Sequence, residues 1–386
     1  MKAEGRVVVF SGPAGSGTYE RMLEAARLAE EWGYEVKVER LFDRMARVAK
    51  ERYGLEITEE NVLNLLRERL ISIRKEAVEE IREEIESSPG FYMVRSPATF
   101  FWGGTLITGL DLDDVMKLRP DAFIVVVDDI MPVKARLEAD PEWKTQRFTL
   151  RDLASWREQE TTLVEELARW TKAEFYVVAR AHPPRVFADL VVHPEKPKAY
   201  ISFPMTHVPP DVYREFEAKK SRFVDELDEL GIVIFDPATM AEGVILSKLE
   251  EYENRARSEG REPDPEEELE IAVSYGGEER VYRYTYQELA AVDPLVEGQI
   301  VKRDFAMIES ANMVIVYNPL GIPSPGVACE MMYAHKVLGR DVYLIWGKEG
   351  RPSPFYTAFC NRRFSTPEEF LEYARTHVRP RWGGMG

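Results

Sequence analysis

The stretch RVVVFSGPAGSGTYE, residues 6–20, decides the fold of the first half of the chain. Its apolar, β-branched run at 7–10 is typical of a buried strand, and apolar residues recur at helical spacing over 22–29. Between the two runs lies a turn that contains three glycines. The order of strand, glycine-rich turn and helix predicts the opening of an α/β domain.

The glycine-rich turn has the layout of a phosphate-binding loop. In such loops backbone N–H groups cradle a phosphate, a Lys reaches its outer oxygens, and the following Ser or Thr holds Mg²⁺. Those two positions here are Thr18 and Tyr19. Without the Lys and the hydroxyl, phosphoryl transfer loses a charge stabiliser and a metal ligand. We therefore expect binding of a nucleotide or phosphate without its transfer, ATP being one possible ligand and the need for Mg²⁺ left open. The residues expected to bind it are Gly12, Gly15, Ser16, Gly17 and Thr18.

Strands and helices alternate through the first half. The sequence predicts strands at 6–10, 35–39, 90–95, 122–128 and 175–179, with helices at 19–32 and 61–86 among the segments between them. Strands separated by helices favour a parallel sheet covered on both faces.

A second α/β unit begins near residue 195, where HPEKPKAYISFP changes register. It contains predicted strands at 199–203, 232–235, 313–317 and 342–346 and helices near 215–230, 298–310 and 327–337. Residues 241–287 form a charged insertion with a predicted hairpin at 273–284. The fold class expected is α/β, with two doubly wound parallel-sheet domains at 1–195 and 196–386, the insertion belonging to the second.

Composition narrows the classes of function. The chain has 386 residues and a net charge of −17, which argues against nucleic acid or an anionic membrane as the main partner. Two cysteines and the lack of a secretory leader or an apolar stretch of ~20 residues favour a cytoplasmic protein without membrane spans. Five His residues and no Cys-x-x-Cys pair predict no metal site. Abundant Glu, Arg and Lys with scarce Gln are typical of heat-adapted proteins.

Three segments of the first half resemble adenylate-kinase-like P-loop kinases. They are FSGPAGSGT at 10–18, the strand and following Arg/Asp segment at 119–141, and the helix and strand at 156–179. The resemblance implies a P-loop kinase-like fold over the first half and phosphate contacts near a lid from Arg136, Arg147 and Arg151. It also implies metal or base contacts from Asp128 or Asp129.

The second half has two candidate carboxylates, of which Glu330 is expected to point back towards the strand ends. Asp304 lies in the helix before the strand at 313–317, and Glu330 lies just inside the helix after it. Open α/β sheets bind ligands at the carboxyl ends of their strands. The first turns of a helix also favour an ionised carboxylate, the form that a nucleophile needs.

This half resembles the nucleoside 2-deoxyribosyltransferase family and its deoxynucleoside-monophosphate N-glycosidase relatives. The matching features are Tyr200 in the opening strand, Arg303–Asp304, Ser310 with Asn312, and SPGVACEMMYAH around Glu330. The resemblance implies a Rossmann-type fold, a Glu330 nucleophile that attacks the sugar C1′, and Asp304 as an orienting or protonating group. It implies substrate contacts from Tyr200 and Asn312. Ser324 stands where many transferases have Asp, and with Gly326 it is a candidate for binding a 5′-phosphate.

The function expected is cleavage or exchange of the N-glycosidic bond of a nucleoside, deoxynucleoside or 5′-monophosphate, beside a nucleotide-binding first domain. A nucleoside deoxyribosyltransferase or a nucleotide N-glycosidase is the enzyme class favoured. Two alternatives stay open: a P-loop kinase or ATPase with an atypical loop, and a non-catalytic nucleotide sensor or assembly protein. The resemblance also implies a homo-oligomer.

Overall fold

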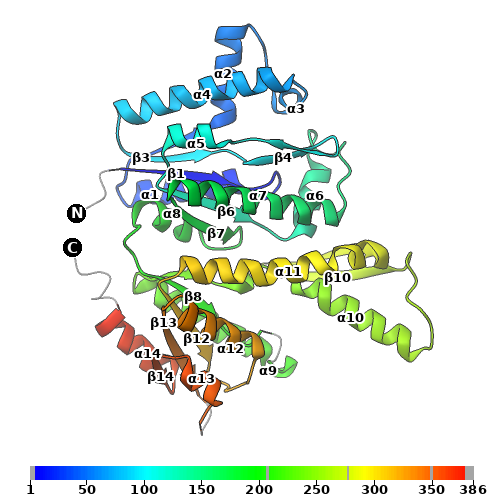
Figure 1. Cartoon of the computed structure of the whole chain (residues 1–386). Coiled ribbons are helices and arrows are strands. Elements are labelled where there is room, and N and C mark those ends of the chain that lie inside the picture. The colour runs from blue at the N-terminus through cyan, green and yellow to red at the C-terminus, as the bar shows by residue number, and fades with distance from the viewer. Residues whose placement is uncertain (1–4, 206–207, 276–277, 348–350, 379–386) are drawn as a thin grey trace. The chain divides into compact units, whose positions relative to one another are not determined.

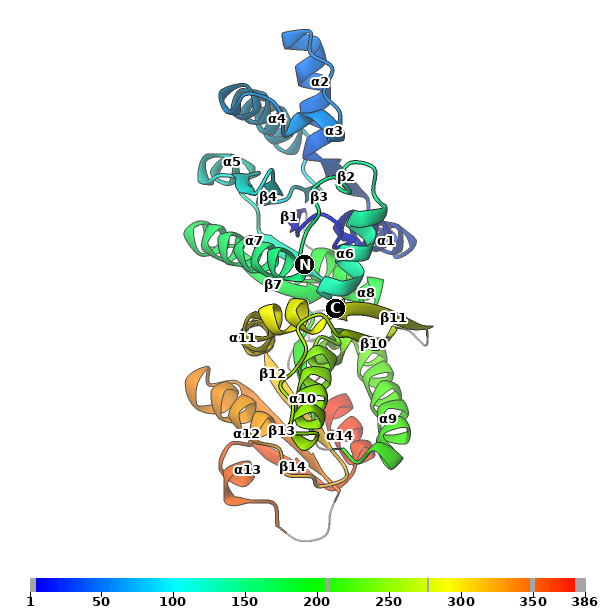
Figure 2. The same cartoon turned by 90° about the vertical axis from the view of Figure 1, so that its right-hand side faces the viewer.

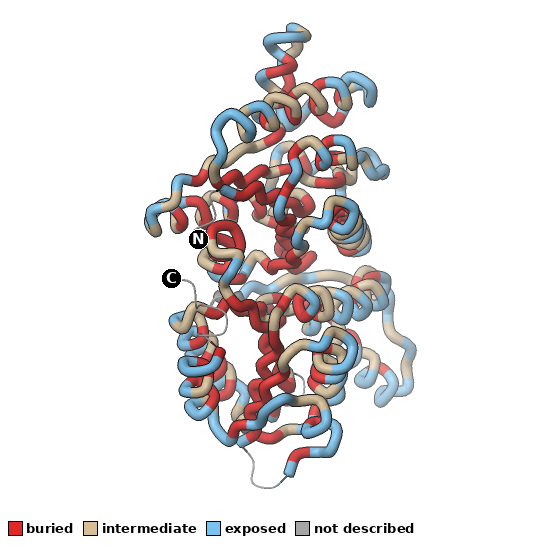
Figure 3. Tube along the Cα trace, turned by 60° about the vertical axis from the view of Figure 1, so that its left-hand side comes forward, coloured by how far each residue is buried: buried red, intermediate tan, exposed pale blue. Residues whose placement is uncertain are grey.

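A computed structural model describes residues 5–205, 208–275, 278–347 and 351–378, and it contains two compact α/β units. The N-terminal unit comprises Ala3–Val192 with Met240–Lys302, and the C-terminal unit comprises His193–Thr239 with Arg303–Gly386. Each has a five-stranded parallel sheet with helices around it, so the predicted α/β class is confirmed (Figure 1). Buried residues follow the strands of both sheets (Figure 3). Within the described ranges no helix is long and apolar enough to cross a membrane.

The N-terminal sheet has the order β2-β3-β1-β6-β7, with every neighbouring pair parallel. All six residues of β1 and of β6 are buried, as expected for strands covered on both faces. Figure 2 shows the sheet between α7 on one side and α1 with α8 on the other. The strands are β1 (Arg6–Ser11), β2 (Val36–Arg40), β3 (Phe91–Arg95), β6 (Ala122–Val127) and β7 (Glu174–Ala179). The helices named here are α1 (Thr18–Glu31), α7 (Leu150–Thr171) and α8 (Pro184–Val192).

The remaining elements of 41–139 differ from the sequence prediction in two places. The helix predicted at 61–86 is divided, because Leu66 takes an extended conformation (φ −55°, ψ 132°) and precedes a new helix. A hairpin also appears at 99–108, closed by Gly103 and Gly104, which both have positive φ. The elements are α2 (Leu41–Tyr53), α3 (Glu59–Val62), α4 (Arg67–Ser87), β4 (Thr99–Trp102), β5 (Thr105–Thr108), α5 (Leu112–Leu118) and α6 (Ile130–Ala139).

The charged insertion packs with the N-terminal unit. Sequence order suggested that 241–287 extends the second domain, whereas residues 240–302 group with the first. The Arg157 guanidinium of α7 donates to both carboxylate oxygens of buried Glu242, at 2.6 and 2.8 Å, and the Ala241 N–H donates to Asp129. These buried polar contacts attach the insertion to the N-terminal unit. The hydrophobic pattern of the sequence carries no signal for such contacts. Its elements are α10 (Gly243–Ser258), the antiparallel strands β10 (Glu268–Tyr275) and β11 (Glu278–Thr285), and α11 (Tyr286–Ser310).

The hairpin predicted at 273–284 corresponds to the ends of β10 and β11, while its glycines at 276–277 lie outside the described residues. The helix predicted at 298–310 begins earlier, since α11 is continuous from Tyr286 to Ser310. Its last residues, from Arg303 onward, belong to the C-terminal unit.

The C-terminal sheet has the order β14-β13-β12-β8-β9, again all parallel. In chain order this is the doubly wound 2-1-3-4-5 arrangement, whose direction reverses between β8 and β12. Ligands of such sheets bind outside the carboxyl ends of the strands at that reversal. The strands are β8 (Lys198–Ser202), β9 (Val233–Phe235), β12 (Met313–Asn318), β13 (Asp341–Trp346) and β14 (Arg362–Phe364), with helices α9 (Pro210–Glu229), α12 (Pro325–Met332), α13 (Pro354–Ala358) and α14 (Pro367–Tyr373).

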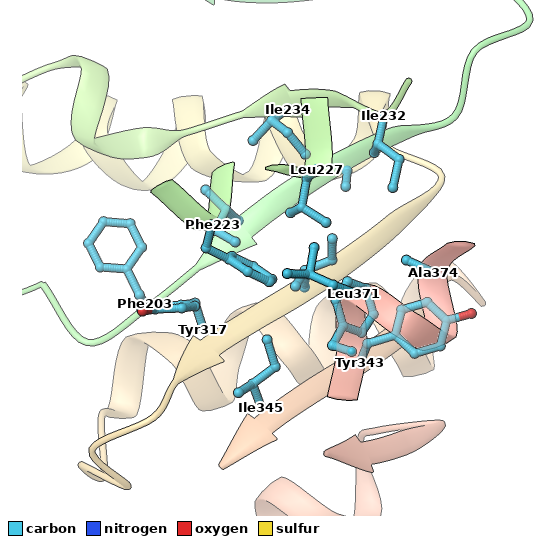
Figure 4. Close-up of a cluster of buried hydrophobic side chains, with 14 of the residues drawn as sticks. Phe203, Phe223, Leu227, Ile232, Ile234, Tyr317, Tyr343, Ile345, Leu371 and Ala374 are labelled. Carbon is cyan, nitrogen blue, oxygen red and sulfur yellow. The ribbon is translucent and has the colours of Figure 1, made fainter. Parts of the chain in front are cut away.

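One face of this sheet packs on α9 and α14. Phe223 lies 5.1 Å from the Tyr317 ring of β12 and 6.0 Å from the Phe370 ring of α14, measured between ring centroids. Figure 4 shows this core, in which Ile234 and Ile345 also take part. This core includes Ala199 and Ile201 of β8 and Phe203, which directly follows the strand. Because side chains alternate along a strand, the residues between them point to the other face.

Candidate active site and glycine-rich turn

Side chains alternate between the two faces of the sheet along β8, so Tyr200 and Ser202 point away from the core that packs on α9. Both are fully buried, and both bond to Glu330 of α12. The Tyr200 hydroxyl donates to Glu330 Oε1 at 2.9 Å, and the Ser202 hydroxyl donates to Oε2 at 2.5 Å. The structure therefore brings Tyr200 and Glu330 together, as the sequence resemblance implied. Ser202 is an additional member of the site, and its position two residues after Tyr200 was the available signal.

The Glu330 carboxylate lies at the point where the sheet order reverses. Desolvation by burial raises the pKa of Glu330 to about 7, with the negative charge of Asp304 acting in the same direction. The hydrogen bonds from Ser202 and Tyr200 oppose this rise, since they stabilise the ionised form. Glu330 as a residue is half-buried, while its carboxylate oxygens bond to the fully buried Tyr200 and Ser202. A carboxylate that titrates near neutrality in such a position is a candidate catalytic group.

Asp304 is the second carboxylate of the site. It lies near the end of α11, is buried, and accepts hydrogen bonds from Arg303 Nε at 3.0 Å and Nη2 at 2.9 Å. Burial raises its pKa, Arg303 lowers it, and the charge of Asp236 raises it further. Since the Asp304 charge also raises the pKa of Glu330, the two carboxylates lie within electrostatic range of each other.

Asp236 and Lys220 are further charged residues of this edge that the sequence reading missed. Asp236 directly follows β9, and its Oδ2 lies 3.1 Å from Nζ of the buried Lys220. Lys220 Nζ also lies 4.0 Å from the centroid of the Phe203 ring and 3.2 Å from Glu217. A polar residue directly after a strand was the sequence signal for Asp236; Lys220 gave none, being one of many charged residues on a helix.

Ser324 serves as the N-cap of α12. Its hydroxyl accepts from the Val327 N–H at 3.5 Å, and its own N–H donates to the Tyr356 hydroxyl at 2.7 Å. The Tyr356 hydroxyl in turn donates to the Ser324 carbonyl at 2.9 Å. Gly326 is exposed, and a Cβ placed there would meet nothing nearer than Ser324 Oγ at 3.9 Å. The structure thus gives Ser324 a capping role and shows no close approach that requires glycine at 326.

Asn312 lies at the opposite edge of the sheet from Glu330. It precedes β12, and its Oδ1 accepts from the Lys198 N–H at the start of β8, at 2.8 Å. The Asn312 N–H returns a 2.8 Å bond to the Lys198 carbonyl. The sequence resemblance grouped Asn312 with the substrate residues, but it joins the amino ends of two strands, away from Glu330.

The glycine-rich turn joins β1 to α1 as predicted. Gly12, Gly15 and Gly17 all have positive φ, at 151°, 76° and 74°. Within the turn, Ser16 Oγ donates to the Pro13 carbonyl at 2.8 Å and lies 2.8 Å from Thr18 Oγ1. Both hydroxyls are buried and bonded inside the turn. They therefore stabilise its shape, which the sequence could not distinguish from a ligand-binding role.

A buried carboxylate of α7, Glu160, holds the first residue of this turn. It accepts from the Gly12 N–H at 3.0 Å and from Ser11 Oγ at 2.6 Å. It also accepts from the Ala98 N–H at 2.9 Å and from the N–H and Oγ1 of Thr99, both at 2.6 Å. The turn is thus tied to the segment that follows β3.

Of the three arginines predicted to approach the turn, the structure brings one to it. Arg136 of α6 donates from Nε to the Gly15 carbonyl at 2.6 Å and pairs with Asp128. Arg147 and Arg151 are exposed, and within the described ranges neither forms a hydrogen bond or ion pair with the turn. Asp129, the other acidic candidate, is buried and accepts from the Ala241 N–H of the insertion.

Two arginines that the sequence analysis did not select also contact the turn. Arg95, the last residue of β3, donates from Nη2 to the Gly12 carbonyl at 3.3 Å. Arg180 follows β7, and its Nε would lie 2.1 Å from a Cβ placed on Gly17. A cavity of about 190 Å³ opens beside Arg95, with Tyr19 and Arg40 also in its wall. Each arginine stands at the carboxyl end of a parallel strand, which was the signal available in the sequence.

Comparison with known proteins adds little. No family model matches the chain, and no curated protein matches it. Among solved structures, the chain is similar to one described as the crystal structure of TT1252 from Thermus thermophilus, at 15% sequence identity and a TM-score of 0.28. The match covers 46% of this chain and 90% of that one. The function therefore has to be argued from the site itself.

Among the described residues, no group of three or more His, Cys, Asp and Glu side chains is arranged to hold a metal ion.

Proposed function

We propose that the C-terminal unit cleaves or exchanges the N-glycosidic bond of a nucleoside or nucleotide, with Glu330 as the nucleophile. The observation that carries the proposal is Glu330 held by Tyr200 and Ser202 at the reversal of the sheet, with Asp304 in electrostatic range. Breaking such a bond gives an oxocarbenium-like transition state, which a carboxylate on the sugar face stabilises and traps.

The reaction has two steps. A Glu330 oxygen forms a bond to C1′ while the bond from C1′ to the base nitrogen breaks and its electrons pass to the base. Water supplies a proton to the departing base, and Asp304, whose carboxylate accepts two hydrogen bonds from Arg303, orients the base. Water, or the nitrogen of a second base, then attacks C1′ and releases Glu330. Hydrolysis and base exchange differ only in that second nucleophile.

Tyr200 and Ser202 position the nucleophile. Each donates to a different oxygen of Glu330, which fixes the rotation of the carboxylate and leaves lone pairs on both oxygens for C1′. Their hydrogen bonds also favour the ionised form that attacks.

For the N-terminal unit, we propose binding of a nucleotide through the glycine-rich turn, without phosphoryl transfer. The positive φ values of its three glycines and the arginines around it support binding. Bonding of the Thr18 and Ser16 hydroxyls inside the turn argues against a metal-assisted transfer site. Incubation of the protein with ATP, Mg²⁺ and nucleoside monophosphates is expected to give no diphosphate product.

Release of free base tests the function of the C-terminal unit. Deoxynucleosides, nucleosides and their 5′-monophosphates are incubated with the protein and the products separated by chromatography. Glu330→Ala and Glu330→Gln are expected to abolish base release, whereas Glu372→Gln, at an exposed Glu of the same unit, retains the wild-type rate. If no substrate gives release that depends on Glu330, the proposal fails.

A further inference from the structure

The turn of the N-terminal unit is surrounded by three arginines, one for each of its positive-φ glycines. Arg95 donates to the Gly12 carbonyl at 3.3 Å, and Arg136 donates to the Gly15 carbonyl at 2.6 Å. Arg180 lies across Gly17, where a Cβ would come within 2.7 Å of its Cδ as well. The three side chains come from the end of β3, from α6 and from the position after β7.

Two of these guanidinium groups keep buried N–H atoms for which the described part of the chain supplies no acceptor. They are Arg95 Nη1 and Arg180 Nε, both inaccessible to solvent. A buried donor without a partner costs about 1–3 kcal/mol, more when it is charged, and native proteins rarely keep one without a reason. Two such donors beside one anion-binding turn indicate an acceptor that the protein chain does not supply.

We propose that Arg95, Arg136 and Arg180 together replace the missing loop Lys and bind the phosphates of a polyphosphate ligand, without requiring Mg²⁺. This inference rests on the proposed nucleotide-binding role of the N-terminal unit and names the residues and ligand class. Guanidinium groups match phosphate oxygens in geometry and carry their charge at all relevant pH values. Three of them supply the charge that Lys and Mg²⁺ share in a standard loop.

Of the acidic groups nearby, Asp128 pairs with Arg136 and offsets its charge, so Arg95 and Arg180 provide most of the positive charge at the turn. Glu160 is occupied by donors from residues 11, 12, 98 and 99. Glu20 is exposed in the first turn of α1. Burial lowers the pKa of Arg95 to about 10 and also lowers that of Arg180. Burial therefore disfavours the charged form of both arginines, which a bound anion would stabilise.

Calorimetric titration of the full chain with inorganic pyrophosphate and with ATP tests the inference. Both are expected to bind in EDTA, with less than a threefold change when Mg²⁺ is added. Arg180→Ala and Arg95→Ala are each expected to weaken pyrophosphate binding about tenfold or more, the value of one charge-assisted hydrogen bond. Arg147→Ala and Arg151→Ala are the matched controls, because these exposed arginines do not contact the turn, and they retain wild-type affinity.

Thermal unfolding separates ligand binding from a structural role. Without ligand, Arg180→Ala is expected to unfold at the wild-type temperature or above, since it removes an unpaired buried donor. The stabilisation that pyrophosphate gives the wild type should be lost in Arg180→Ala and largely kept in Arg180→Lys. Binding that is equal in Arg180→Ala and Arg147→Ala, or that requires Mg²⁺, overturns the inference while leaving nucleotide binding intact. A wild type that binds neither pyrophosphate nor ATP overturns both.

Discussion

The Tyr200 hydroxyl donates a 2.9 Å hydrogen bond to Glu330 Oε1 across the reversal of the C-terminal sheet. Tyr200→Phe keeps the buried ring and removes only this bond. We expect base release to fall about tenfold, the value of a hydrogen bond to a charged group. Initial rates of base release measure this, with Tyr343→Phe, a Tyr on the core face of the sheet, as the control. Equal rates in the two variants would contradict a positioning role for Tyr200.

The dependence of base release on pH should report Glu330. Because the nucleophile must be ionised and the pKa of Glu330 is about 7, the rate is expected to rise as pH passes through 7. Tyr200→Phe and Ser202→Ala remove bonds that lower this pKa, so the rise moves to higher pH. Asp304→Asn removes a charge that raises it, so the rise moves to lower pH. Rate profiles between pH 5 and 9 give both shifts, and shifts of one sign in all three variants would contradict the assignment.

Glu330 also makes folding stability depend on pH. Its pKa is raised in the folded state above its ordinary value of 4.5, so the folded state binds more protons between about pH 4.5 and 7. Stability from this group is therefore fully present below the unfolded pKa and lost as pH rises through 7. Glu330→Gln removes this loss, and we expect it to be more stable than the wild type at pH 8. Chemical denaturation at pH 5 and 8 checks the difference, with Glu372→Gln as the control.

The Arg157–Glu242 pair should be important for the stability of the N-terminal unit. Both side chains are buried, and the guanidinium bonds both carboxylate oxygens. Glu242→Ala leaves a buried charge without its partner and is expected to cost about 3–5 kcal/mol. Urea unfolding measures the loss. A double variant with Arg157→Met should recover part of it, whereas additive losses would show that the two residues do not act as a pair.

Asn312 and Glu330 lie at opposite edges of one sheet, so their variants should separate stability from chemistry. Asn312→Ala leaves the Lys198 N–H without its acceptor and is expected to cost about 1–3 kcal/mol of stability. The rate of base release per folded molecule should stay at the wild-type value. A selective loss of activity would show instead that Asn312 acts in the site.

Strands and parallel sheets could be predicted because their signals are local. The run at 7–10 and the glycines after it specify β1, its turn and α1, and the same holds for β8 and β12. Tyr200 and Glu330 could be placed for the same reason, because one lies in a strand and the other in a helix that local patterns predict. The Gly103–Gly104 hairpin also has a local signal, because two glycines lie between short β-rich runs, although it is not among the elements predicted above.

Features that depend on distant partners could not be predicted. Asn312 directly precedes a predicted strand of a parallel sheet, which places it at the amino edge, but its bond to Lys198 joins it to a strand 114 residues away in the sequence. Arg180 follows the carboxyl end of a predicted strand, but the approach of its side chain to Gly17 depends on residues far away in the sequence. Glu242 is one acidic residue in a highly charged segment, and nothing local marks it as the buried partner of Arg157.

The chain leaves the N-terminal unit after Val192, returns to it at Met240 and leaves it again after Lys302. During synthesis, the last segment of the N-terminal unit therefore emerges only after β8 and β9 have been made. The C-terminal sheet must in turn wait for β12, which pairs with β8 more than a hundred residues later. A nascent chain that ends at 192 lacks the Glu242 carboxylate for Arg157, and one that ends at 302 lacks the centre of its second sheet. The N-terminal unit is thus complete only at residue 302 and the C-terminal sheet only after β14, so truncated products are expected to be targets for proteolysis.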